Sequence, residues 1–342
     1  MIEIALAHSW NRYLDLFEEQ QDIYFREEYV KLYETPQERG CCLVAREGEN
    51  IMIFPFLARS FEYEGKSFYD FETAYGYGGP LFNTTNEYFI QRALVSSEQF
   101  LKQEGFICGF VRFHTLIENY KYCAQESVQF DRLTVSMDLT PSQEDIWQKQ
   151  IHSKNRNVIK KGEKSGLSFV ADYDYKYISD FIRLYNSTMR RIGADEFYFF
   201  NQSYYDSFIR DIKNSFLGIV LLGEKVISAA IFMYNGRYGH YHLSGSDHDY
   251  LYCSPNNFML YSAALELKKQ GVEVFHLGGG TSSSEDDSLF AFKSKFSPYR
   301  HQFYLGKFIF NRPLYEVICR DWSIKNPEKV EKYNRYLLKY KY

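Results

Sequence analysis

One stretch of this chain constrains its fold more than any other: an apolar run that ends on three glycines. Residues 274–277, Val-Phe-His-Leu, are typical of a strand, and Gly278, Gly279 and Gly280 follow directly. Glycines after a strand mark backbone that takes unusual dihedral angles or that a ligand approaches closely. We favour the ligand, so these three glycines are candidate binding residues.

The segment after the glycines predicts a helix that buries a lysine. At about 100° per residue, one arc of roughly 160° holds four apolar side chains, those of Leu289, Phe290, Phe292 and Phe296. Lys293 falls inside this arc, whereas Lys295 falls well outside it. An ammonium on a buried face is costly unless it is paired or used. Lys293 is therefore a candidate catalytic residue, unless its four-carbon stem carries the charge to the surface.

Length and composition favour a two-domain protein of the cytoplasm. A chain of 342 residues exceeds the usual single-domain size,. The net charge of -4 argues against a protein built around general nucleic-acid affinity,. The sequence has no N-terminal signal and no apolar run long enough to cross a bilayer. Its six cysteines lack C-x-x-C spacing, so we expect reduced thiols and no metal,.

The order of predicted elements occurs twice along the chain. The first half has a hairpin at 40–59, a glycine-punctuated extended segment at 68–82, a helix at 86–104 and a strand at 106–113. The second half has a hairpin at 217–234, a strand at 238–243, a helix at 255–270 and a strand at 272–277. This predicts an α/β (α+β) fold of two tandem modules, 1–145 and 146–342, packed together with a cleft between them. Helices are expected between about 140 and 215 and at the C-terminus.

A basic helix is predicted around residues 151–164. Trp147, Ile151 and Val158 share its apolar face,. The opposite face carries the basic side chains of Lys154, Arg156, Lys160, Lys161 and Lys164. Such a face is either solvated or binds a phosphorylated partner, such as a nucleotide-linked sugar, a lipid pyrophosphate, coenzyme A or tRNA.

Two further segments could hold anions. Ser254 and Pro255 are typical of a helix start, and an exposed helix N-terminus binds anions. A pyrophosphate is therefore possible at Ser254, Asn256 and Asn257. Elsewhere, Arg190 and Arg191 precede the aromatic cluster at 197–200. Arginine suits bidentate capture of carboxylate or phosphate, although adjacent arginines on a helix point in different directions.

The missing motifs narrow the chemistry. The sequence has no Gly-x-Ser-x-Gly elbow and no Walker or dinucleotide glycine pattern, which disfavours hydrolases, NTPases and dehydrogenases. A reaction without a protein nucleophile is favoured: a bound amine attacks a bound thioester or ester while the site stabilises the oxyanion. Lys293 could supply that positive charge. The general base is open, with Asp70 first, then Glu72 or His242.

Several motifs together resemble a known family. They are Leu277-Gly278-Gly279-Gly280, Asp287-x-Leu289, Phe292-Lys293-x-x-Phe296, Tyr241 to Ser246, Ser254-Pro255-Asn256, Thr188-Met189-x-Arg191, the basic segment 152–156 and the segment 75–80. These motifs resemble the Fem family, the aminoacyltransferases of peptidoglycan bridge formation, and related GNAT-like N-acyltransferases of surface-glycan synthesis. The resemblance implies two GNAT-type modules in tandem. It also implies an acyl-transfer site lined by Phe292 and Lys293, with acceptor contacts from Arg191, Tyr198 and Tyr241.

Two departures bear on the acyl donor. The long helical-hairpin arm of some Fem enzymes has no counterpart, and the usual GNAT pyrophosphate-loop pattern is missing between Tyr241 and Phe258. We expect an N-acyltransferase that moves an acyl group, acetyl in the first instance, from acyl-CoA to a nucleotide-linked or lipid-linked amino sugar or other cell-envelope glycan precursor. The alternatives are a Fem-type aminoacyltransferase that uses charged tRNA and a non-catalytic protein that binds glycan precursors.

Overall fold

The computed structural model describes residues 2–284 and 286–342 and divides the chain into two compact units. Unit 1 contains the chain up to Gln20, Tyr24–Asp131 and Phe303–Tyr342; unit 2 contains Gln21–Ile23 and Arg132–Gln302. The sequence predicted one division near residue 145. The C-terminal segment instead belongs with unit 1, because its strand and helices pack there.

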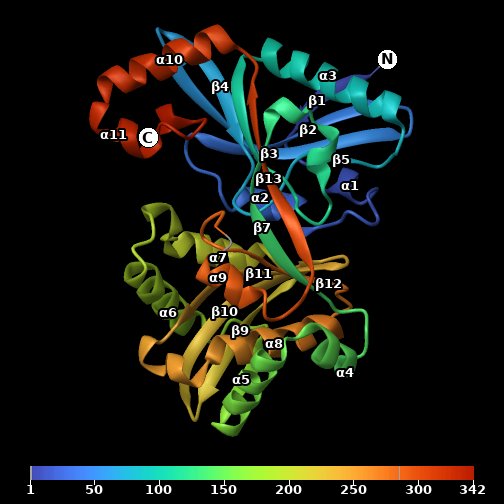
Figure 1. The fold of residues 1–342 in the computed structure, drawn as a ribbon. Coiled ribbons are helices and arrows are strands. Elements are labelled where there is room, and N and C mark those ends of the chain that lie inside the picture. Colours follow the sequence, from blue (N-terminus) through green and yellow to red (C-terminus); the bar gives the residue numbers. More distant parts are fainter. Residues whose placement is uncertain (1, 285) are drawn as a thin grey trace. The chain divides into compact units, whose positions relative to one another are not determined.

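Unit 1 is an α/β unit around one sheet (Figure 1). Its strand order is β1 (Glu3–Ala7), β2 (Glu38–Glu47), β3 (Asn50–Tyr63), β4 (Lys66–Glu72), β6 (Phe106–Arg112) and β13 (Arg300–Ile309), with β5 (Leu81–Phe82) beside β3. Only β4 and β6 pair in parallel; the other neighbours are antiparallel. The helices are α1 (Asn11–Leu14), α2 (Glu27–Lys31), α3 (Glu87–Gln103), α10 (Arg312–Lys325) and α11 (Pro327–Tyr333).

Unit 2 has a sheet of the same design. Its strand order is β8 (Leu167–Asp172), β9 (Ser215–Leu222), β10 (Lys225–Asn235), β11 (Tyr238–Ser246), β12 (Val274–Gly279) and β7 (Val128–Asp138). Here β11 and β12 are the parallel pair. The helices are α4 (Gln143–Asp145), α5 (Ser153–Lys164), α6 (Ile178–Arg191), α7 (Gln202–Asp211), α8 (Pro255–Lys269) and α9 (Ser288–Lys293).

The predicted repeat is confirmed by this common design. In each unit three antiparallel strands lead to a parallel pair whose two strands are joined through a helix, α3 in unit 1 and α8 in unit 2. These helices end just before Gly105 and Gly271, close to the predicted stops. The last strand of each sheet comes from a distant segment: β13 pairs with β6 in unit 1, and β7 pairs with β12 in unit 2.

Helices cover both faces of the unit 2 sheet. Ile159 of α5 and Met259 of α8 join the strands β9, β10 and β12 in one apolar core. On the other face, α6 lies so close to β11 that a Cβ at Gly245 would stand 2.3 Å from the Leu184 carbonyl carbon. The next residue, Ser246, bonds instead to Asn256 of α8, as expected when successive strand residues face opposite sides. No helix among the described residues is long and apolar enough to cross a membrane.

Candidate active site

The parallel strands of unit 2 separate in the middle of the sheet. β11 and β12 pair only from Tyr238–Val274 to His240–His276. Directly afterwards each strand has a bulge against its other neighbour. His242 is the extra residue of β11 and Leu277 the extra residue of β12. Bulges change the direction of side chains and are frequent beside active sites. We therefore look for an active site of unit 2 at this position.

The glycine triplet ends β12 at this point, and the surrounding chain explains it. Gly278 has a φ of 77°, a left-handed conformation that favours glycine,. A Cβ at Gly279 would lie 2.8 Å from the Leu133 carbonyl oxygen, and one at Gly280 would lie 2.3 Å from a carboxylate oxygen of Asp287. The close approach that the sequence indicated is therefore made at least partly by the chain itself. A direct role of the three glycines in ligand binding stays a prediction.

Lys293 is buried, as the helical periodicity predicted. Its exposed fraction is 7%, whereas Lys295 is exposed. The Nζ atom donates a hydrogen bond of 2.7 Å to the carbonyl oxygen of Gly279, so the last residue of α9 reaches back to the end of β12. The half-buried ring of Phe292 packs against the core and meets Phe296 edge-on at 5.5 Å.

The Lys293 amine has an unusual electrostatic setting. Burial lowers its pKa to about 7; the charge of Asp287 opposes this shift and that of Arg132 adds to it. The Tyr241 ring centroid lies 5.7 Å from Nζ. Across the described residues, the Gly279 carbonyl is the sole hydrogen-bond acceptor of this amine. An ammonium has three donors, so two N–H groups of a buried cation are left for a ligand.

Two aromatic side chains of β11, those of Tyr241 and the extra residue His242, lie at the bulge. The Tyr241 hydroxyl donates to Ser244 Oγ at 2.6 Å, and burial raises the pKa of this phenol to about 12. His242 Nε2 lies 3.2 Å from the hydroxyl of Tyr204 on α7. Burial first, and then the neighbouring His240, lowers the pKa of His242 to about 3. This imidazole is therefore neutral near pH 7, and its role as a base stays a prediction.

Asp287 is the site residue to which sequence reasoning gave no role, although it belongs to the quoted Asp287-x-Leu289 motif. It precedes α9 and its side chain accepts from the Phe290 N–H at 2.9 Å. The same carboxylate binds Thr281 and Ser282, just after the glycines. The available signal was an acidic residue immediately before a short apolar helix, which is a typical N-cap.

The start of α8 is less suited to a pyrophosphate than its sequence indicated. Asn256 Oδ1 accepts from the hydroxyls of Ser228 and Ser246, at 2.8 and 2.7 Å. Asn257 Nδ2 donates to Asn155 Oδ1 at 2.7 Å. These amides hold α8 to the sheet and to α5. Pro255 has no N–H, and the N–H groups of Asn257 and Phe258 both point to the Ser254 carbonyl.

The basic segment forms α5, after a break in the predicted long helix at Ile151. Arg156 points inward and its Nη1 donates to the carbonyl of Ile151 at 2.6 Å, as well as to those of Trp147 and Gln148. The exposed lysines Lys154, Lys160, Lys161 and Lys164 fall within about 120° of the helix circumference,. We call these four the lysine face. None of them forms an ion pair with any residue in the described ranges.

The lysine face begins next to the end of α9. The His152 N–H donates to the Lys295 carbonyl at 2.9 Å, and Asn155 Nδ2 donates to the same oxygen at 3.3 Å. Lys154 therefore stands in the first turn of a helix that is fixed two residues beyond Lys293. The other predicted acceptor contacts also belong to unit 2: Arg191 is exposed at the end of α6, and Tyr198 is half-buried in a 3₁₀ turn.

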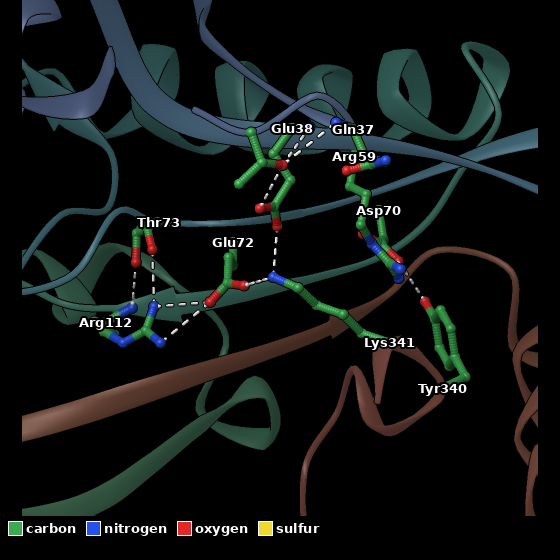
Figure 2. A network of polar contacts seen from close by, with 10 residues as sticks. Gln37, Glu38, Arg59, Asp70, Glu72, Thr73, Arg112, Tyr340 and Lys341 are labelled. Atoms are coloured by element: carbon green, nitrogen blue, oxygen red, sulfur yellow. Dashed lines mark hydrogen bonds and ion pairs between the residues drawn. The ribbon is translucent and has the colours of Figure 1, made fainter. Parts of the chain in front are cut away.

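Asp70 and Glu72, the first candidates for the general base, belong to a polar network in unit 1. Figure 2 shows Asp70 beside Arg59 and Tyr340. Arg59 Nε donates to Asp70 at 3.0 Å, and the Tyr340 hydroxyl donates at 2.9 Å. The Asp70 carboxyl is 1% exposed, and burial raises its pKa although Arg59 opposes the shift.

The Glu72 carboxylate also forms hydrogen bonds to cationic side chains. Lys341 Nζ donates to its Oε1 at 2.7 Å, and Arg112 donates to its Oε2 at 3.1 Å (Figure 2). Burial opposes ionisation, but Arg112 and Lys341 hold the pKa of Glu72 below its usual range. Both carboxylates therefore have cationic partners within unit 1, and their role as bases stays a prediction.

A comparison of the sequence with known protein families finds a match in unit 2. Residues 150–294 match the family model described as acetyltransferase (GNAT) domain, and the matched range lies wholly within unit 2. Unit 2 contains a GNAT-like acyltransferase domain. The predicted resemblance is confirmed for this unit, and the match includes β11, β12 and α9 through Lys293.

Solved structures of similar fold cover nearly the whole chain. The crystal structure of FemX superposes with a TM-score of 0.69 at 16% identity, over 92% of this chain and 99% of that one. A tandem GNAT protein from the clavulanic acid biosynthesis pathway gives 0.51 at 9% identity, over 90% and 98%. The C-terminal domain of a putative lysylphosphatidylglycerol synthetase from Agrobacterium fabrum gives 0.53 at 15% identity, over 88% and 92%. No curated protein matches the chain.

Proposed function

We propose that unit 2 transfers an acyl group from a bound donor to a bound amine, and that the Lys293 ammonium stabilises the oxyanion of this reaction. The observation that carries the proposal is a lysine Nζ that is almost fully buried and has one acceptor among the described residues, the Gly279 carbonyl. A buried cation with unused donors is costly. A negative charge that develops on the donor carbonyl oxygen would satisfy it at the moment of reaction.

The reaction needs no protein nucleophile. The acceptor nitrogen attacks the acyl carbon, the carbonyl electron pair moves onto oxygen, and the resulting oxyanion accepts hydrogen bonds from Lys293. The oxyanion then collapses, the bond to the leaving sulfur or oxygen breaks, and an amide remains. The attacking amine loses one proton, which we assign to the leaving group. We do not assign it to Asp70, because Arg59 and Tyr340 already occupy that carboxylate.

For the acceptor, we propose an amino sugar or another cell-envelope glycan precursor that carries phosphate through a nucleotide or lipid link. The lysine face supports a phosphorylated acceptor, because it lies on a helix whose first turn is bonded to the end of α9, its four lysines form no ion pair in the described ranges, and phosphate is the group that clustered ammonium charges bind,. Arg191, Tyr198 and Tyr241 remain the proposed contacts to the sugar.

Acyl-CoA is the first proposed donor, since the matched family model is an acetyltransferase domain. An aminoacyl ester of tRNA is the second. Two observations favour it: the likeness to FemX extends over 99% of that chain, and the start of α8 has few free groups for a pyrophosphate. Both donors are found in the cytoplasm, where we place the reaction.

The test measures donor and acceptor together. Purified protein is incubated with acetyl-CoA or with charged tRNA, each combined with a panel of amino-sugar nucleotides, and products are identified by mass. We expect one donor to raise the melting temperature and to give an N-acylated product. Loss of product after RNase treatment would identify tRNA. If neither donor stabilises the protein or yields product, the proposed reaction is wrong.

A further inference from the structure

Asp287 binds the end of β12 and the start of α9 with a single carboxylate. Its Oδ2 accepts from the N–H and hydroxyl of Thr281, at 2.9 and 2.7 Å, and from the N–H and hydroxyl of Ser282, at 3.0 and 3.1 Å. Its Oδ1 accepts from the Phe290 N–H at 2.9 Å. Gly280 leaves the space for this carboxylate, because a Cβ there would meet Oδ1.

This carboxylate is ionised and its acceptor sites are in use. It is 8% exposed, and although burial opposes ionisation, the donors of Thr281, Phe290 and Ser282 hold its pKa below the usual range. No hydrogen bond joins Asp287 to Lys293 within the described part of the chain. The carboxylate therefore acts on Lys293 through its charge and through the loop that it shapes.

Three groups from three elements bear on the Lys293 amine. Asp287, before α9, favours the charged form, while Arg132 of β7 disfavours it. Tyr241 of β11 presents its ring, whose phenol is neutral. Arg132 is itself directed to the adjacent carbonyl, since its Nη1 donates to Gly280 O at 2.8 Å. Asp287 is therefore the anion that counteracts the lowering of the Lys293 pKa by burial and by Arg132.

We propose that Asp287 is a positioning residue that fixes both the place and the ammonium charge of Lys293. The same hydrogen bonds that join Thr281 and Ser282 to the start of α9 hold the Gly279 carbonyl opposite Nζ. The consequence for acyl transfer rests on the proposed role of Lys293. The charge coupling itself does not, so it can be measured without turnover.

The experiment titrates the Lys293 amine directly. Folded protein is pulse-labelled with isotopic acetic anhydride from pH 5 to 10, and mass spectrometry reports the labelled fraction of the peptide that contains Lys293. Only the neutral amine reacts, so the midpoint reports its titration. In Asp287→Asn the opposing charge is gone, and we expect the midpoint to fall by about one pH unit. Thr281→Val keeps the charge and removes one hydroxyl donor, so its midpoint should match that of the wild type.

A purely structural N-cap predicts a different pattern. In that case Asp287→Asn and Thr281→Val would both loosen the loop, and neither would move the midpoint unless Lys293 became exposed and titrated like Lys295. An unmoved midpoint in folded Asp287→Asn would overturn the proposal. So would a wild-type Lys293 that labels with the same midpoint as Lys295. Asp287→Glu, which keeps the charge on a longer stem, should retain the midpoint and serves as the second variant if Asp287→Asn does not fold.

Turnover then separates this inference from the proposed function. With acyl transfer measured across the same pH range, Asp287→Asn should lose activity at a lower pH than the wild type, by the shift seen in labelling. If Lys293→Met keeps wild-type turnover while the labelling shift is observed, the coupling stands and the oxyanion role of Lys293 is wrong. If Lys293→Met is inactive and the midpoint does not move, the oxyanion role stands and the role of Asp287 is wrong.

Discussion

The two units share a strand order but treat their parallel pair in opposite ways. In unit 1 the β4–β6 ladder runs to Glu72–Phe110, and backbone bonds continue the contact from Thr73 N–H to Phe110 O and from Gly78 N–H to Arg112 O, at 3.0 and 2.7 Å. In unit 2 the β11–β12 ladder ends at His240–His276 and both strands bulge. The two parallel strands stay hydrogen-bonded along their length in unit 1, whereas they separate after three residue pairs in unit 2. The family match covers unit 2.

The two units also differ in how their charged side chains are paired. In unit 1 the buried carboxylate of Asp70 and the half-buried carboxylate of Glu72 each bind a cation, and the C-terminal residues Tyr340 and Lys341 complete the network (Figure 2). In unit 2 the buried Lys293 has a backbone carbonyl as its single acceptor within residues 2–284 and 286–342. A satisfied network contributes to stability, whereas an incompletely bonded cation indicates a ligand. We therefore expect substitutions in unit 1 to change stability and substitutions around Lys293 to change turnover.

The largest effect is expected from Lys293→Met. Removal of one oxyanion donor typically lowers kcat by about 10²–10³-fold. Folding should survive, because burial holds the pKa of Lys293 near 7, below its ordinary value of 10.5. The unfolded chain thus binds more protons between these values, and the folded state gains stability as pH rises through that window. Below it the buried ammonium is a cost that methionine removes. Steady-state kinetics and urea unfolding test both points, with exposed Lys295→Met as the control.

Arg59→Met should have the opposite effect. It leaves the Asp70 carboxylate buried without its cation, which costs about 3–5 kcal/mol of unfolding free energy for such pairs,. Turnover per folded molecule should stay at the wild-type value. The double variant Arg59→Met with Asp70→Leu should recover much of the loss, since no charge is then left unpaired. A fall in kcat without a fall in stability would end the division of roles between the units.

The lysine face should affect substrate binding more than chemistry. Replacing Lys154, Lys160, Lys161 and Lys164 with glutamine should raise KM for the phosphorylated acceptor by about tenfold and leave kcat unchanged, with a weaker dependence of KM on salt. Glutamine at Lys66, Lys102, Lys325 and Lys332, four exposed positions in unit 1, is the control with the same change of charge. An equal rise in KM in this control would show a general charge effect rather than a binding face.

The smallest effect is expected from Tyr340→Phe. This change removes the hydroxyl that donates to Asp70 and lies 3.1 Å from Cys108 Sγ. Arg59 still pairs with the carboxylate, so the loss in unfolding free energy should be about 1 kcal/mol. Thermal unfolding measures it. A change in acyl-transfer rate with unaltered stability would show that the C-terminal segment takes part in the reaction.

The sequence predicted features that depend on local periodicity. The burial of Lys293 and the exposure of Lys295 followed from the 3.6-residue repeat, and the two helices that end before Gly105 and Gly271 followed from their glycine stops. The twofold order of elements followed from recurring strand and helix patterns. Each of these signals lies within about twenty residues of chain, where sequence pattern is informative.

Long-range pairing could not be predicted in the same way. The network around Asp70 could not be predicted in full, because one of its two partners, Tyr340, lies 270 residues away along the chain. The C-terminal segment was assigned to the second module because nothing in its sequence states that β13 pairs with β6. Nothing near Asn256 and Asn257 in the sequence indicates that their amides bond to Ser228 and Asn155, and their role as anion ligands stays a prediction.

Chemical rescue of Lys293→Ala tests the central claim most directly. The shortened side chain leaves space at the end of α9, and an added alkylammonium such as ethylammonium can place a cation there. We predict that Lys293→Ala is nearly inactive and regains turnover in a saturable manner as ethylammonium is added, while Lys295→Ala does not respond. Wild-type turnover by folded Lys293→Ala without any added amine would contradict the account.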